Sequence, residues 1–361
     1  MAPNILKKLN WLLILPAVLL TLLGLLSIYS SCSGQGNLLS LKRQILFFII
    51  SLFLVILFTF FDLRSLKKNS YIILTLYFFS ILSLLGLLFF GSRIRGVKGW
   101  YDFGAFSFDP VPISAIILII VLSKYFSVRH IETKRFQPIL FSALYLLIPV
   151  FLILFQPDLG SSLILIFVWL GMIIFSGIKF RHFLILALIF LILAGTAWLF
   201  WLEDYQKARI TSFLKPGIDP EGISWNINQS KIAIGSGGFF GKGITKGSQT
   251  QYSFLPETKT DFIFSSLAEE TGFLGVSILL FSFGFLLWQI IKIAFQSDNN
   301  FNRLFAAGFA FLVLSQALIN IGMCLGLLPI IGIPLPFVSY GGSQLLAFYF
   351  GLAILSSLRR Y

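Results

Sequence analysis

Four carboxylates lie close together in the stretch FLPETKTDFIFSSLAEE, residues 254–270, where a long apolar run begins. Glu257 and Asp261 precede the apolar run, and Glu269 and Glu270 lie inside it. A carboxylate at the start of an apolar helix is a credible general base if a substrate hydroxyl comes within hydrogen-bond reach. The residues alone leave open whether Asp261 takes a proton, holds a hard metal cation or orients a substrate.

The other three carboxylates suggest structural roles. Glu257 is expected to cap the start of the helix or to pair with Lys259. Glu269 lies eight residues beyond Asp261, which is about 12 Å along a helix and about 80° around it, so the two side chains do not share a face. Acids inside a membrane span are costly and usually face a cavity. For Glu269 and Glu270 we weigh such a position against bonds to a polar residue on a neighbouring helix, which would organise the bundle.

The composition indicates which elements must position these groups. The chain is 57% hydrophobic and 11% charged, whereas a soluble domain has about 25% charged residues. Continuous apolar runs of roughly 20 residues predict membrane-spanning helices, because barrel strands would alternate. About ten runs qualify: 10–30, 44–61, 71–91, 112–127, 138–155, 160–178, 183–202, 262–296, 303–325 and 337–357. We predict an all-α polytopic membrane protein, a single domain over residues 1–361, with the first run retained as a span.

Lysine and arginine in the short loops predict the orientation. They concentrate on one side if both termini are cytoplasmic, as the positive-inside rule requires. The net charge of +13 therefore reflects topology, and no nucleic-acid partner is expected. The acids concentrate on the outer side, which indicates chemistry or cation handling there. Two cysteines and two histidines do not make a metal site here, so any metal would be a hard cation held by oxygen.

One outer segment, about 203–260, is far longer than the other loops. Structureless loops beyond about 15 residues are usually functional or disordered, and the aromatic and aliphatic residues here favour a folded segment with a short helix through Ile227 to Ile234. The stretch IGSGGFFGKG resembles a phosphate-binding loop but has Ser236 and Gly243 where that motif needs Gly and Ser or Thr. Its glycines are expected to permit tight turns.

Polar residues also interrupt other apolar runs on the predicted outer side. Each alone is explained by capping or snorkelling. Together they suggest one polar cavity that opens outward, since broken backbone at membrane depth is tolerated only where it is buried or lines a cavity. The candidates are Arg43, Gln44, Asp158, Gln316, Asn320 and Ser339.

Several of these motifs are similar to those of the SEDS family (shape, elongation, division and sporulation). The resemblance rests on QPDLGSS, on NINQSKIAIGSGGFFGKGITKGSQTQYSFLPETKTDFIFSSLAEETGFLG and on NIGMCLGLLPIIGIPLPFVSYGGS, and covers nearly the whole chain. The form GSQTQYSFLPETKTDFIF resembles elongation members more than division members. The resemblance implies a peptidoglycan glycosyltransferase that polymerises lipid II on the outer face of the bacterial cytoplasmic membrane, paired with a class B penicillin-binding protein. It makes Asp261 the essential acid.

One stretch departs from the family pattern. In KGWYDFGAFSFDPVPISAI, Trp100 matches, but Asp109, Pro112 and Ala115 stand where most relatives have Gln, Glu and Lys. The chain therefore lacks a carboxylate and a cation on one side of the expected cavity. Asp109 is a candidate substitute for part of them.

The implied reaction needs a base for the sugar hydroxyl and positive charge for the leaving diphosphate. The available cations are Arg43, Lys231, Lys242 and Lys259. With Gln44, Trp100, Asp158, Gln316, Asn320 and Ser339 they form the predicted substrate-binding set. Mg²⁺ or Mn²⁺ bridging Asp261 and the diphosphate is a further possibility, and no organic cofactor is expected. A lipid II flippase and a non-catalytic scaffold for the penicillin-binding protein remain the alternatives.

Overall fold

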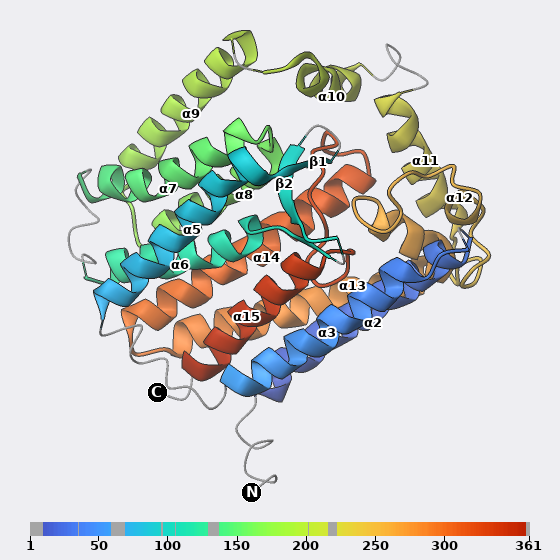
Figure 1. Cartoon of the computed structure of the whole chain (residues 1–361), viewed down its shortest axis with the longest axis horizontal. Coiled ribbons are helices and arrows are strands. Elements are labelled where there is room, and N and C mark those ends of the chain that lie inside the picture. The colour runs from blue at the N-terminus through green and yellow to red at the C-terminus, as the bar shows by residue number, and fades with distance from the viewer. Residues whose placement is uncertain are drawn as a thin grey trace, which may run out of the picture.

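A bundle of long helices makes up most of the computed structural model of the chain (Figure 1). The structure describes residues 10–34, 36–58, 69–94, 97–104, 106–128, 137–200, 202–215 and 222–358. The start of α2 and the end of α15 lie at one end of the bundle, and α10, α11 and the strands lie toward the other. This arrangement agrees with an even number of crossings. Most of the loop cations used to orient the chain lie outside the described residues, so the cytoplasmic side stays a prediction.

Within the described residues, eight helices are long and apolar enough to cross a membrane. They are α2 (Trp11–Gly34), α3 (Leu39–Phe58), α5 (Ser70–Phe90), α6 (Val111–Val128), α7 (Gln137–Phe155), α9 (Phe180–Phe200), α13 (Ile263–Gln296) and α14 (Asn300–Cys324). Two more apolar helices, α8 (Leu159–Phe175) and α15 (Gly342–Leu358), are slightly shorter. These helices fall in the ten predicted runs and confirm the all-α polytopic class.

The centre of the bundle is built around α14, which packs against α6, α8 and α13, while α15 packs against α3. Small residues allow the helices to approach closely. A side chain on Gly171 would collide with the ring of Phe311, and one on Gly308 would collide with Ile119 and Met172. The core therefore depends on fitted helix surfaces, which suits a lipid environment where hydrophobic burial does not drive association.

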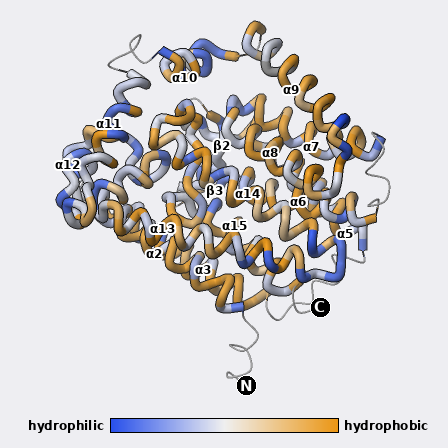
Figure 2. Tube along the Cα trace, turned by 180° about the vertical axis from the view of Figure 1, so that it is seen from behind, coloured by the Kyte–Doolittle hydropathy of each residue, from blue (hydrophilic) through white to orange (hydrophobic). Residues whose placement is uncertain are grey.

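The outer surface of the bundle is apolar over most of the length of its helices (Figure 2). Helix α9 is the extreme case: among the residues whose burial the structure describes, none in its most apolar stretch is buried, and Leu188 and Leu191 are more than half exposed. Contiguous apolar surfaces of this extent mark contact with lipid or protein. The surface therefore supports a multi-pass membrane location.

The long outer segment is folded. It contains α10 (Asp204–Leu214), α11 (Ile223–Ser236) and α12 (Ser248–Gln251), and α11 confirms the helix predicted around Ile227. Three short antiparallel strands, β1 (Ser92–Ile94), β2 (Val97–Asp102) and β3 (Ser107–Phe108), form a small sheet before α6. This sheet was not predicted from the sequence.

Candidate functional site

Asp261 lies in a turn just before α13, and its backbone is held tightly. Three consecutive carbonyl groups accept bonds from distant residues: that of Lys259 from the Tyr340 amide (2.8 Å), that of Thr260 from Ser339 Oγ (2.7 Å) and that of Asp261 from Asn320 Nδ2 (2.9 Å). The Asp261 side chain is half-buried. The fold therefore fixes the position of this carboxylate through the chain that carries it.

The supporting residues are themselves braced from several helices. Gln44 of α3 donates to the Ser339 carbonyl (3.2 Å) and accepts from the Gly341 amide (3.1 Å). Asn320 of α14 also donates to the Ile333 carbonyl (2.8 Å). The side chains of Gln44, Asn320 and Ser339 are at most 4% exposed. These bonds make the three residues supports of the Asp261 turn, and their predicted contact with substrate stays a prediction.

The Asp261 carboxylate shares one small space with Arg209 of α10. A Cβ placed on Gly332 would lie 3.7 Å from Asp261 Oδ2 and 4.0 Å from Arg209 Nη1. Arg209 Nη1 also donates to the Ile331 carbonyl (3.3 Å). The sequence prediction missed Arg209, because its only signal was membership of the long outer segment.

A cavity adjoins this space on the Arg209 side. It is lined by polar groups of Asp158, Gln206 and Arg209 and by apolar residues such as Val97, Leu163 and Ile330. The cavity holds about 180 Å³, less than the 300–1,000 Å³ typical of a site that encloses a drug-sized ligand. It therefore has room for part of a large substrate rather than for all of it.

Asp158 lines the cavity, and it is also the N-cap residue of α8. Its carboxylate accepts from the Ser161 amide (3.0 Å) and from Ser161 Oγ (2.5 Å), which caps the start of the helix. The capping explanation is confirmed, while contact between Asp158 and substrate stays a prediction.

Asp109 lies near Asp158, at the start of α6. Its carboxylate accepts from the Val111 amide (2.9 Å), and its own amide donates to Ser343 Oγ (2.9 Å). Burial raises the pKa of the Asp109 carboxyl to about 7; the Val111 amide opposes this rise and the charge of Asp158 adds to it. Asp109 thus provides a carboxyl group at this side of the bundle, where Pro112 and Ala115 provide none.

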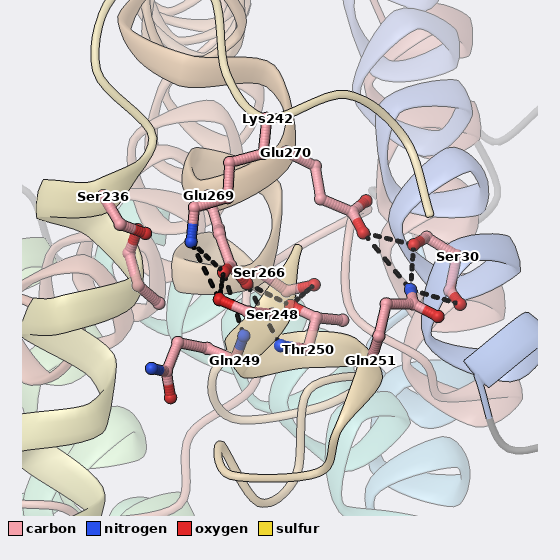
Figure 3. A network of polar contacts seen from close by, with 11 residues as sticks. Ser30, Ser236, Lys242, Ser248, Gln249, Thr250, Gln251, Ser266, Glu269 and Glu270 are labelled. Carbon is pink, nitrogen blue, oxygen red and sulfur yellow. Dashed lines mark hydrogen bonds and ion pairs between the residues drawn. The ribbon is translucent and has the colours of Figure 1, made fainter. Parts of the chain in front are cut away.

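Glu269 and Glu270 form a second polar network, separate from the Asp261 supports (Figure 3). Glu269 is fully buried and accepts from Lys242 Nζ (2.8 Å), the Gln249 amide (2.9 Å) and both the amide and hydroxyl of Thr250 (3.0 and 2.9 Å). It therefore caps the start of α12 from another helix. Glu270 accepts from Ser30 of α2. The bundle-organising hypothesis is confirmed for both acids.

Lys242 was predicted to bind the substrate diphosphate; that contact stays a prediction, and the structure gives Lys242 a partner within the protein. Its ammonium group forms an ion pair with Glu269 and also donates to Ser248 Oγ (2.9 Å), with 29% of the side chain exposed. Lys242 therefore fastens the outer segment to α13.

The glycine-rich stretch docks against a kink in α13. Gly272 has φ +65°, and the amides of Lys242 and Gly243 donate to the Glu269 and Glu270 carbonyls, both at 3.0 Å. A side chain on Gly241 would lie 2.1 Å from the Glu270 carbonyl oxygen. The predicted turn-forming role of these glycines is confirmed, and their second role is close backbone contact.

The other predicted substrate ligands have the following positions. Lys259 and Arg43 are half-buried beside Asp261 and Gln44 in the chain, and Lys231 is exposed with its stem against Gly326. Trp100 is half-buried in β2, and Gln316 accepts from Gln344 Nε2 (3.1 Å). Their contact with substrate stays a prediction.

Glu257 shapes the turn before α13, whereas the N-cap of that helix is Phe262; its predicted pair with Lys259 stays a prediction. Its carboxylate accepts from Thr260 Oγ1 (3.0 Å), and its carbonyl accepts from the Thr260 and Phe262 amides (3.1 and 3.2 Å). These bonds shape the turn that carries Asp261.

The structure defines a multi-pass helical membrane protein in which the backbone around one acid, Asp261, is fixed in a turn before α13. The model of the FtsW, RodA and SpoVE cell cycle protein family matches residues 10–361, and the chain belongs to this family. This membership confirms the resemblance to the SEDS family.

Individual relatives agree with the family assignment. The chain is 35% identical to the peptidoglycan glycosyltransferase MrdB of Escherichia coli K12, over 79% of this chain and 77% of that protein. It is 34% identical to stage V sporulation protein E of Bacillus subtilis strain 168, over 97% and 96% of the two chains.

Solved structures share the whole fold. Thermus thermophilus rod shape determining protein RodA superposes with a TM-score of 0.71 at 29% identity, covering 98% of this chain and 97% of that one. A chain from a peptidoglycan synthase complex, described as coordinating polymerization and crosslinking, gives a TM-score of 0.83 at 31% identity, covering 98% of both chains.

Proposed function

We propose that this protein is a peptidoglycan glycosyltransferase that polymerises lipid II into glycan strands on the outer face of the cytoplasmic membrane, in cell elongation. One observation carries the assignment of the site: three consecutive backbone carbonyls fix Asp261, while its carboxylate and the Arg209 guanidinium both lie beside the Cβ position of Gly332. A fixed carboxylate beside a cation suits a reaction in which a hydroxyl loses a proton and a diphosphate leaves.

The reaction joins two lipid-linked glycans. The oxygen of a sugar hydroxyl attacks the anomeric carbon of the other substrate and forms the new glycosidic bond. The bond from that carbon to the diphosphate oxygen breaks, and its electron pair leaves with the lipid diphosphate. Asp261 takes the hydroxyl proton in this proposal, and its fixed backbone keeps the carboxylate oriented during the transfer.

A divalent cation is compatible with this arrangement. Among the described residues there is no group of three or more His, Cys, Asp or Glu side chains that would hold a metal ion alone. Mg²⁺ characteristically binds one or two carboxylates together with substrate phosphates, so Asp261 would hold Mg²⁺ or Mn²⁺ only jointly with the diphosphate. The ion would supply positive charge to the leaving group.

We also propose that the protein acts with a class B penicillin-binding protein that crosslinks the new strands. Support comes from the structural similarity to a chain of a peptidoglycan synthase complex over 98% of both chains. The partner's membrane segment would meet the apolar outer surface of the bundle.

The test is polymerisation of labelled lipid II by the purified protein, with and without its penicillin-binding partner. Asp261→Ala and Asp261→Asn should lower the rate at least about 100-fold, since general-base catalysis contributes roughly 10²–10⁴. Asp102→Asn is the matched control, because Asp102 is an exposed carboxylate on β2. Polymer formed at an unchanged rate by both Asp261 variants would refute the catalytic assignment.

The same experiment separates the alternatives. Movement of lipid II across liposomes containing the protein, without polymer, would indicate a flippase. Polymerisation that requires the partner and is insensitive to Asp261 would indicate a scaffold.

A further inference from the structure

We infer that Arg209 binds the diphosphate of the lipid-linked substrate in a gap that Gly332 keeps open opposite Asp261. The inference rests on the proposed function, because it names the residue that would receive the leaving group of that reaction. Arg209 lies 52 residues before Asp261 in the sequence, and only the fold brings the two together.

The gap is defined by the missing side chain of Gly332. Apart from its chain neighbours, only Asp261 Oδ2 and Arg209 Nη1 come within 4 Å of the Cβ position, among the residues that the structure describes. An oxygen atom placed near this point would be close to both charged groups. Gly332 has φ +83°, a conformation that disfavours any residue with a side chain. The backbone geometry therefore keeps this space empty.

Arg209 is well placed and well supported. Its helix, α10, begins with a capping box in which the Glu203 amide donates to Gln206 Oε1 (3.1 Å). Arg209 lies in the next turn, where Nη1 donates to the Ile331 carbonyl (3.3 Å). A guanidinium has five N–H donors in a planar fork that matches phosphate oxygens. It can therefore hold the Ile331 carbonyl and a diphosphate oxygen together.

The cavity beside Arg209 matches the remainder of a lipid diphosphate. Its apolar lining includes Leu159, Leu163, Ile210 and Ile330, and Arg209 is its one cation among the described lining residues. A ligand with a charged head joined to a hydrocarbon chain has the same distribution of polarity. The gap over Gly332 would take the diphosphate, and the apolar wall would take the first part of the lipid.

A purely structural ion pair with Asp261 predicts different behaviour. In that case Lys would replace Arg209 with little loss, and the affinity for a lipid diphosphate would not change. A diphosphate site predicts loss of affinity in Arg209→Met and a partial loss in Arg209→Lys, because lysine is a point charge without the fork. Lys207→Met is the control, since Lys207 is a half-buried cation on the same helix.

The gap itself is tested with glycine variants. Gly332→Ala adds a methyl group in van der Waals contact with both charged side chains, 3.7 Å from Asp261 Oδ2 and 4.0 Å from Arg209 Nη1. Gly177→Ala is the matched control, because Gly177 has φ +84° and, apart from its chain neighbours, no described residue has a heavy atom within 4 Å of its Cβ position. Both variants carry the same backbone strain, and only the first fills the gap.

Two readouts are measured on the full-length protein in detergent: direct binding of undecaprenyl diphosphate, which needs no turnover, and polymerisation of lipid II. Arg209→Met should polymerise about 100-fold more slowly, the effect of removing one transition-state donor, and should bind the probe at least about tenfold more weakly. Lys207→Met and Gly177→Ala should retain probe binding. Thermal unfolding verifies that each variant is folded.

The outcomes are distinguishable. If the wild-type protein makes polymer and Arg209→Met or Gly332→Ala binds the probe as well as wild type does, this inference is wrong and the proposed function stands. If the wild-type protein makes no polymer under any condition, the proposed function fails, and the binding data still show whether Arg209 recognises a diphosphate.

Discussion

Replacing Glu269 by Gln should destabilise the protein far more than it slows the chemistry. Glu269 is fully buried and accepts five bonds, one of them from the Lys242 ammonium. Hydrogen bonds to a charged group contribute about 1.5–3 kcal/mol each and those to a neutral group about 0.5–1.5. Glutamine also turns one acceptor into a donor that faces the donors of Gln249 and Thr250.

Full loss of a buried pair costs about 3–5 kcal/mol. Lys242 is 29% exposed and regains part of its hydration, so we expect about 2–4 kcal/mol for Glu269→Gln. The catalytic rate of the folded fraction should change less than about tenfold, because Asp261 has separate supports in Asn320 and Ser339.

The assay is thermal or denaturant unfolding in a fixed detergent, with Lys242→Met and the double variant completing a mutant cycle. Residues in direct contact should show a coupling of about 0.5–3 kcal/mol. Ser277→Ala, on an exposed part of the same helix, is the control. If Glu269→Gln is as stable as wild type, the network does not stabilise the fold. If the variant is stable but inactive, Glu269 takes part in the chemistry and is not only an anchor.

Three other changes test the site. Asn320→Ala removes a donor from the Asp261 and Ile333 carbonyls and should cost about 2–3 kcal/mol and lower kcat more than it raises KM in a polymerisation assay. Because the folded Asp109 carboxyl holds its proton up to about pH 7, its contribution to stability is complete below about pH 4 and is lost as the pH rises to 7; unfolding of Asp109→Asn should lack that fall in stability, and identical pH profiles would contradict the shift. Chelation of divalent cations should slow polymerisation at least about tenfold with recovery on adding Mg²⁺ or Mn²⁺, and an unaffected rate would leave Asp261 acting without a metal.

The helices were predictable from the sequence because a segment that spans the membrane must be apolar over roughly 20 residues. The composition of the run 303–325 alone predicts a membrane-spanning helix, and α14 (Asn300–Cys324) has nearly the same bounds. The strands β1 to β3 were missed because they are at most six residues long and their pairing depends on each other. Short polar strands give no periodic signal in a sequence dominated by membrane helices.

The site was predictable only in part. Composition and motif located Asp261, Gln44 and Asn320 on the outer side, but residue type does not say whether an amide faces a cavity or a backbone carbonyl. The structure gives Asn320 two carbonyl acceptors, which makes it a support. No local motif marked Arg209, because its proposed role depends on its position beside Gly332, which is more than 100 residues further along the chain.

The two polar networks explain why the acids in and just before α13 have different roles. Asp261 precedes the helix, where the supports bond to its backbone and leave the carboxylate facing Arg209. The Glu269 carboxylate accepts bonds from α12 and from Lys242, and the Glu270 carboxylate accepts a bond from Ser30 of α2. An acid whose oxygens are all engaged by fixed donors makes a poor base, because it must lose those bonds to accept a proton. Glu269 and Glu270 are therefore suited to anchoring rather than to proton transfer, and the kink at Gly272 allows the loop donors to reach this pair.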